Sequence, residues 1–199
     1  MSKRAIVCAA LFLLAVPKSG AAQQATGGWD ISGSVAQAWF SNAATGESTD
    51  FGPSPSLMVR LGVTRRFAKW EISFVADNTP SVLRASDSVS VLQISALSFG
   101  RTGLAFLLGR TLSHAGSASV VAGAGLRLDT WSLPEEEHRS RAGGEVHAAL
   151  RFDAGALAIE NRLTIGLSGS PFDAADLPDG YRRNSLKWME VGVGVRLGL

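Results

Sequence analysis

The sequence predicts an all-β fold, namely an eight-stranded antiparallel up-and-down transmembrane β-barrel. Apolar and polar residues alternate along most of the chain. This period of two is typical of a β-strand, because successive side chains of a strand point to opposite faces. Glycine accounts for 22 of the 199 residues and charged residues for only 18%, which suits many short strands better than long helices. Long and short connections also alternate along the chain, which is typical of a barrel whose loops are long at one end only.

The first segment, residues 1–22, is expected to be a secretory signal peptide that precedes a barrel domain over residues 23–199. Lys3 and Arg4 come before an apolar run over residues 5–16, and small residues lead to Ala22, where a signal peptidase would cleave. The run is too short for a membrane-spanning helix, which needs about 20 residues. We therefore prefer a cleaved signal to an anchor helix that stays attached.

Cleavage after Ala22 would change both the cysteine content and the charge. It would remove Cys8, which is the one cysteine in the sequence. We then expect no disulfide, no metal–thiolate site and no cysteine nucleophile in the mature protein. Three basic residues leave with the segment, so the formal charge falls from +2 to −1. The basic balance of the full chain therefore gives no reason to expect a nucleic-acid partner.

Eight strands are predicted from the alternating segments and the connections between them. Seven segments have a clear register, and they cover residues 29–35, 57–63, 70–74, 124–130, 146–152, 157–167 and 189–199. The eighth lies within residues 88–112, where serines and the pair Leu107 and Leu108 blur the pattern.

The connections fall into two classes that alternate in chain order. The short ones are predicted at residues 65–69, 113–117 and 153–156, and the long polar ones at residues 41–54, 78–88, 132–144 and 169–185. All the long loops then emerge at the same end of the barrel. Outer-membrane barrels have this asymmetry, with short periplasmic turns and long outer loops.

The two faces of the strands differ in a way that predicts which one is outside. One face is almost purely apolar, and among the clear registers it is interrupted only by Gln37 and Asn161. The other carries five arginines and six acids, which are Arg60, Arg127, Arg151, Arg162, Arg196, Asp30, Glu71, Asp129, Glu145, Glu160 and Glu190. We expect the apolar face to contact lipid and the charged residues to pair inside a closed, narrow lumen. A soluble lipocalin-like carrier would have the two faces exchanged.

Aromatic residues near the strand ends predict two girdles at the membrane interfaces. At the turn end these are Trp29, Phe67, Trp70 and Phe152, and at the loop end they are Trp39, Phe40, Trp131 and Trp188.

The sequence does not lead us to expect a catalytic, cofactor-binding or metal-binding residue. His114 is predicted to be a solvated turn residue, and His147 a hydrogen-bonding residue of the lumen. His138 and Ser140, close to residues 135–137, could belong to a Ser-His-acid site for acyl transfer. We expect them instead in a solvated, charged loop. No metalloprotease, P-loop, Rossmann or EF-hand spacing occurs.

With its signal segment, its glycine-rich strand over residues 120–126 and its alternating last strand, the sequence resembles the eight-stranded outer-membrane β-barrel superfamily. This superfamily includes the OmpA transmembrane domain and the OmpX/Ail-like proteins. The resemblance implies a Gram-negative outer-membrane protein with a structural or surface-interaction role. Its implied partners are outer-membrane lipid, periplasmic chaperones and the barrel-assembly machinery, and we expect a monomer with an unknown loop ligand. The sequence departs from the superfamily at Leu199, where members usually have Phe or Trp. A lipid A deacylase on the same barrel is the alternative that involves catalysis; there the residue after the serine is Asn, where this chain has Arg141.

The signal segment makes a direct prediction about the mature protein. N-terminal sequencing of protein extracted from the outer-membrane fraction should begin at Gln23. Recovery of Met1, or of mature protein only in the periplasmic fluid, would contradict it.

Overall fold

The computed structural model describes residues 27–133 and 138–199. The predicted signal peptide and its cleavage site lie outside these residues. Within the described part, no helix is both long and apolar enough to span a bilayer.

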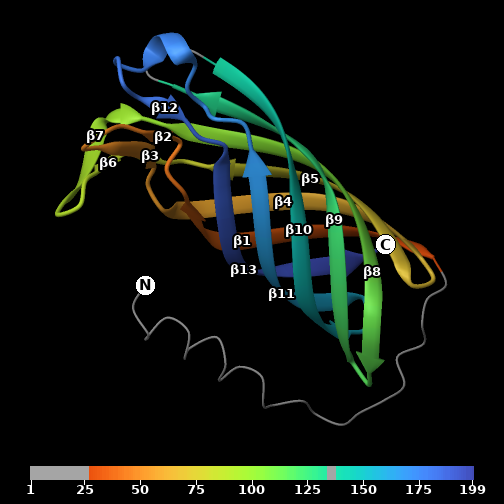
Figure 1. Cartoon of the computed structure of the whole chain (residues 1–199). Coiled ribbons are helices and arrows are strands. Elements are labelled where there is room, and N and C mark those ends of the chain that lie inside the picture. The colour runs from red at the N-terminus through yellow and green to blue at the C-terminus, as the bar shows by residue number, and fades with distance from the viewer. Residues whose placement is uncertain (1–26, 134–137) are drawn as a thin grey trace.

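Eight antiparallel strands form a closed barrel, which confirms the predicted fold class (Figure 1). Around the barrel each strand pairs with the two beside it, and β1 closes on β13. The barrel strands are β1 (Gly28–Phe40), β4 (Ser56–Phe67), β5 (Trp70–Thr79), β8 (Gly100–Ala115), β9 (Ala118–Ser132), β10 (His138–Ala154), β11 (Leu157–Ser168) and β13 (Leu186–Gly198).

The register of the strands fixes the width and tilt of the barrel. Following paired residues once around the barrel from Trp29 leads back to β1 at Trp39, ten residues farther along. A shear of this size with eight strands corresponds to a tilt of about 40° and an interior only as wide as its own side chains. The register therefore leaves little room for a channel.

Three two-residue turns join the strands at one end, as predicted. They lie between β4 and β5, between β8 and β9, and between β10 and β11. The first residue of each turn has a positive φ, which is 51° at Ala68, 61° at Gly116 and 69° at Gly155. Glycine adopts this conformation without strain, so Ala68 is the strained member of the three.

The connections at the other end are more structured than the sequence predicts. They contribute a second sheet, which we name the loop sheet, with its strands in the order β12-β2-β3-β6-β7. It lies beyond the barrel in Figure 1. Its strands are β2 (Ala44–Thr45), β3 (Asp50–Pro53), β6 (Val82–Ser86), β7 (Val91–Ser98) and β12 (Arg182–Arg183), and a 3₁₀ turn, η3 (Ala174–Asp176), lies close by in sequence.

Two of the predicted boundaries at this end are wrong. The ambiguous segment 88–112 contains two strands, because β7 belongs to the loop sheet and only β8 to the barrel. The predicted loop 132–144 is mostly strand, because β10 begins at His138. Cross-strand hydrogen bonding extends β9 and β10 through a polar sequence that alternation alone does not mark as a strand.

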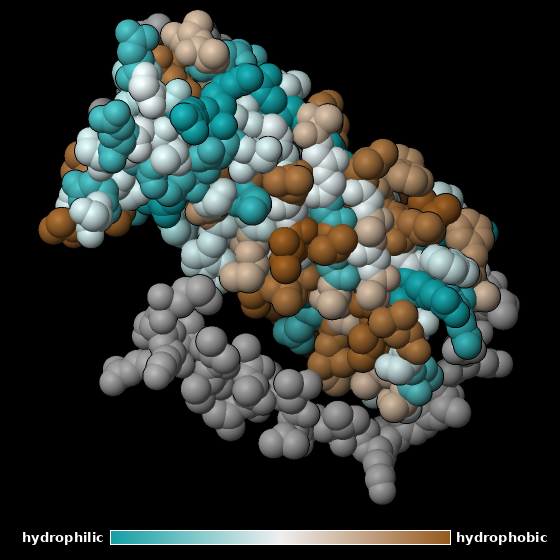
Figure 2. Space-filling model, in the orientation of Figure 1, coloured by the Kyte–Doolittle hydropathy of each residue, from teal (hydrophilic) through white to brown (hydrophobic). Residues whose placement is uncertain are grey.

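The apolar face is on the outside, which is the arrangement of a membrane barrel and excludes the lipocalin-like alternative. Leu61, Phe74, Phe106, Leu126 and Val193 are all exposed, although they are large and apolar. Figure 2 shows hydrophobic residues, in brown, gathered over the barrel and mostly hydrophilic residues over the loop sheet. Trp29 and Trp39 are both exposed on β1, and the rise and tilt of the strand separate them by about 25 Å along the axis. That distance matches the height of the apolar band of outer-membrane barrels.

Replacing Val193 with arginine should make insertion into lipid vesicles less favourable by about 2–4 kcal/mol, since this exposed side chain lies near the middle of the apolar band. The matched control is Val89→Arg, in the turn between β6 and β7, where the valine is 93% exposed and a charge should cost little. Equal refolding titrations for the two variants would mean that the apolar face does not contact lipid. A serine at Gly194 is not a neutral control, because a Cβ there would lie 2.7 Å from the Gly33 carbonyl oxygen.

Candidate functional site

The barrel interior holds two clusters of ion pairs, and we name the one nearer the loops the loop-side cluster. Asp77 is its centre and receives hydrogen bonds from Arg60, Arg101 and Arg127 over 3.2 to 3.3 Å. The cluster consists of these four residues with Asp129, Glu145 and Glu190. Glu190 lies 2.9 Å from Arg60, which also reaches Glu145 on β10, at the opposite wall of the barrel. The cluster therefore ties together strands that are not neighbours.

The second cluster, which we name the turn-side cluster, has Glu71 and Glu160 at its centre. Arg151 lies 2.9 Å from Glu71 and 3.0 Å from Glu160, and Arg196 contacts both at 3.1 and 3.2 Å. Its other members are Arg162, Arg66 and Asp30. With three arginines and four acids in one cluster, and four arginines and three acids in the other, the described interior is balanced.

Two small cavities lie beside these clusters. One cavity, lined by Arg60, Thr64, Arg162 and Glu190 among others, has a volume of about 30 Å³. Another, at the turn end beside Asp30, has a volume of about 40 Å³. Each has room for about one water molecule.

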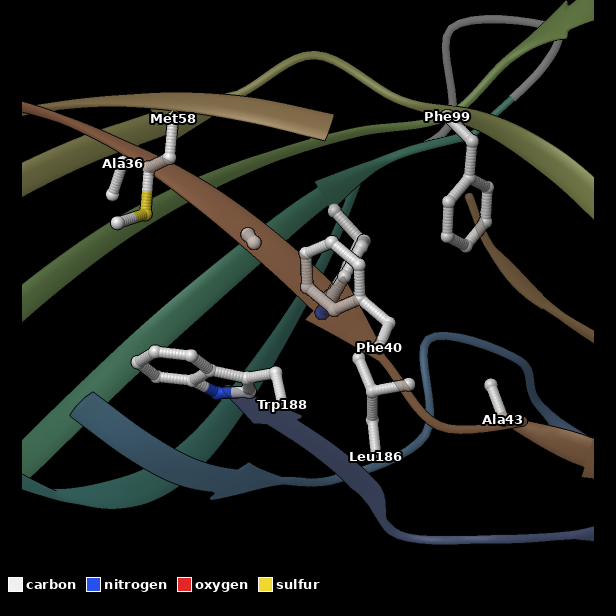
Figure 3. Packing of buried hydrophobic residues seen from close by; sticks show 9 residues of the cluster. Ala36, Phe40, Ala43, Met58, Phe99, Leu186 and Trp188 are labelled. Carbon is white, nitrogen blue, oxygen red and sulfur yellow. The ribbon is translucent and has the colours of Figure 1, made fainter. Parts of the chain in front are cut away.

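Above the loop-side cluster, apolar side chains fill the barrel mouth, and we name this group the aromatic plug. Phe40, Phe99, Trp131 and Trp188 form its core, and the ring centres of Phe99 and Trp131 lie 5.2 Å apart with the rings tilted by 38°. Figure 3 shows Phe40, Leu186 and Trp188 converging between the strands. Gly166 makes room for the plug, because a Cβ there would lie 2.1 Å from the Trp188 ring.

The plug corrects the predicted loop-end girdle. Trp39 is exposed as expected, but Phe40, Trp131 and Trp188 point inward and are buried. At the turn end Trp29, Phe67 and Trp70 are exposed as predicted, and Phe152 is half-buried. Strand ends in this barrel are therefore not always at an interface, because the loop sheet extends the interior beyond the membrane.

Arg101 connects the plug to the charges below it. Its guanidinium carbon lies 4.6 Å from the Trp188 ring centre and 5.3 Å from that of Phe40, while one nitrogen donates to Asp77. Arg127 lies on Trp188 at the same distance of 4.6 Å. Cation–π contacts are strongest where the cation is desolvated, as both arginines are here.

All eleven charged residues predicted to face inward do so. The prediction missed Arg66, Arg101 and Asp77. Alternation continued from Glu71 and Ser73 would have reached Asp77. His147 faces inward but does not form the predicted hydrogen bond, since neither ring nitrogen has a partner among the described residues. His114 is exposed as expected, but it lies at the end of β8 and not in the turn where the sequence placed it.

His138 and Ser140 lie on β10 and are exposed, so the expectation of a loop position is wrong. Their register partners are Ser132 and Thr130 on β9. The His138 Nδ1 atom lies 3.2 Å from the Ser132 hydroxyl, and Ser140 shares a 3.1 Å hydrogen bond with Thr130. Residues 135–137, the expected acidic partners, lie outside the described residues.

Salt bridges also hold the outer connections to the barrel. Arg139 on β10 binds Asp176 in η3, and Arg141 binds Asp173 at 2.7 Å. The hydrogen bond from Arg139 holds the pKa of Asp176 below its ordinary value. In the loop sheet Asn42 accepts from Arg84 and donates to Asp50, each over 2.7 Å. The loop sheet therefore has its own polar contacts.

Comparison with known proteins identifies the fold. No protein-family model and no curated sequence matches the chain. The crystal structure of Neisserial surface protein A aligns with a TM-score of 0.62 and 10% identity over 86% of this chain and 97% of that one. The outer membrane protein OprG from Pseudomonas aeruginosa aligns with a TM-score of 0.56 and 11% identity, over 87% and 97%.

Because Glu190 is buried against Arg60, replacing it with glutamine should lower the free energy of unfolding by about 3–5 kcal/mol. The control is Glu47→Gln. Glu47 is exposed in a loop, so this change should alter the free energy of unfolding by less than about 0.5 kcal/mol. The measurement is a urea titration in lipid vesicles. The same midpoint for both variants would mean that the interior charges are solvated.

Proposed function

Proceeding from a fold shared with eight-stranded outer-membrane barrels, we propose that this protein is a non-catalytic outer-membrane barrel with a closed lumen and a structural or surface-interaction role. The observation that carries the proposal is the filled interior, in which two balanced clusters of ion pairs lie beneath the aromatic plug.

Closure follows from the cost of an unpaired charge. An ion that crossed the barrel would have to displace Arg60 from Glu145 or Arg151 from Glu71, and both contacts join strands that are not neighbours in the barrel. Breaking a buried pair leaves an uncompensated charge and costs about 3–5 kcal/mol. The aromatic plug is a second, apolar barrier to a hydrated ion.

With the lumen closed, the loop sheet is the part that can meet molecules outside the membrane. Rigid scaffolds commonly carry their function on connecting segments. This sheet has five strands and includes the stacked pair Phe51 and Tyr181, whose ring centres lie 5.3 Å apart. A fixed surface of this kind suits recognition better than a set of mobile loops would, because less conformational entropy is lost on binding.

The proposed location is the outer membrane, after export with a cleaved signal peptide. The exposed apolar band supports contact with outer-membrane lipid. Periplasmic chaperones and the barrel-assembly machinery would deliver the chain, and Leu199 is exposed at the end of the last strand for such an encounter.

A lipid-modifying activity is the second candidate, because His138 and Ser140 lie on the outer surface near the loop end. A Ser-His-acid site needs the nucleophile against one ring nitrogen and a carboxylate on the other. Here Ser140 bonds Thr130, and His138 contacts Ser132, so the described side chains are not arranged as a triad. The non-catalytic role is therefore preferred.

Purified protein in planar bilayers should give no steady single-channel conductance, because both clusters and the plug obstruct the path. A variant with the plug reduced, Trp188→Ala with Phe40→Ala, should still conduct little, since the ion pairs remain. A large and stable wild-type conductance would overturn the closed-lumen proposal and favour a pore.

Cells that express wild-type protein, the double variant His138→Ala with Ser140→Ala, or no protein should have the same lipid A acyl pattern by mass spectrometry. Loss of an acyl chain that requires both side chains would instead establish the lipid-modifying activity.

A further inference from the structure

Asn161 is a polar side chain on the outer face of the barrel, inside the apolar band. It is exposed on β11 between Ile159 and Leu163, and across the strands it pairs with Leu150 and Val193. All four of these neighbours are apolar. The amide makes no hydrogen bond with any described residue, although Asn78, Thr102, Thr130 and Ser140 on the same face are hydrogen-bonded in pairs.

Depth separates Asn161 from the other outward polar side chains. Strand rise, spacing and tilt place it about 8 Å above the level of Trp29, well inside a band of about 25 Å. Gln37 lies about 20 Å above that level by the same reckoning, near the loop-side edge, and its amide donates to the Ala38 carbonyl. Thr130 and Ser140 lie beyond the band. Among the described residues, Asn161 is therefore the one whose side-chain amide faces the hydrocarbon without a hydrogen-bond partner.

Hydrocarbon provides no hydrogen-bond partner, so an amide at this depth favours contact with another polar group in the membrane. We propose that the wall formed by β10, β11 and β13 is a dimer interface in which Asn161 bonds to Asn161 of a second copy of this chain. The proposal goes beyond the closed-lumen role and does not depend on it.

Symmetry favours a second copy over other occupants. Two barrels with the same orientation in a membrane are related by a two-fold axis along the membrane normal, which keeps equivalent residues at equal depth. An Asn161 near that axis therefore meets its own copy. An amide has both donor and acceptor groups, so two asparagines can exchange a reciprocal pair of hydrogen bonds.

The surroundings of Asn161 fit such a contact. The strand tilt places Val191 almost directly above it and Phe152 almost directly below it along the barrel axis. Val191 and Val193 are 44% and 48% exposed, and Leu163 and Ile159 are 43% and 48% exposed. The polar group is thus framed by apolar side chains that would pack on the same residues of the partner. The proposed dimer differs from the monomer that the sequence led us to expect.

The predicted mature chain has no cysteine, so single cysteines report on the interface without a background. In proteoliposomes at a low protein-to-lipid ratio, Val191→Cys should give a covalent dimer with a short bis-maleimide. The control Phe106→Cys is on β8, four strands from β13 and thus across the barrel, and should stay monomeric.

Adding Asn161→Leu to Val191→Cys should lower the dimer yield at least fivefold, and Asn161→Gln should restore most of it. Heat-modifiable migration on a gel checks that each variant is a folded barrel. Any of three results would overturn the proposal. These are no dimer with Val191→Cys, equal dimer yields at the two cysteine positions, and a dimer yield that Asn161→Leu leaves unchanged. A lipid as the occupant of the Asn161 surface would give the first of these results.

Discussion

Charges inside a barrel this narrow must be paired, and the rest of the structure depends on that constraint. Eight strands with a shear of ten enclose a space that side chains fill, so bulk water has little access to the seven arginines and seven acids described there, of which Arg66 at the turn end is the most exposed. Each arginine is therefore bonded to carboxylates, and bonds such as Arg60 to Glu145 tie opposite walls together. The charges that would line a pore in a wider barrel here act as crosslinks. Function is left to the two surfaces outside the lumen.

Those surfaces have opposite chemistry. The band between Trp29 and Trp39 is apolar because lipid solvates no polar group, and beyond it the loop sheet holds polar contacts such as Asn42 with Asp50. Asn161 is an exception on the outside, and on the inside the ring nitrogens of His147 have no hydrogen-bond partner among the described residues. The difference is that a second molecule can reach Asn161, whereas His147 is enclosed by the barrel.

The sequence predicted what depends on alternation and missed what depends on distant contacts. Period two was sufficient to place Glu71, Arg151 and Arg196 inside and Val193 outside, because a strand leaves each side chain a choice of only two faces. Asp77 was missed because the predicted strand ended at Phe74, whereas β5 continues to Thr79. Arg101 was missed because β7 and β8 follow each other within one serine-rich segment. The inward orientation of Trp131 and Trp188 could not be predicted, since it depends on a loop sheet assembled from three separate connections of the chain.

The central claim, that paired charges close the lumen, is tested most directly by the exchange of arginine side-chain protons with water. In protein labelled with ¹⁵N-arginine and refolded in lipid nanodiscs, NMR should detect slow exchange for the Nε–H protons of Arg60, Arg127 and Arg151, all of which are buried. The exposed Arg182 serves as the internal reference and should exchange rapidly. Exchange of the interior arginines at the rate of Arg182 would mean a water-filled lumen and would contradict the account.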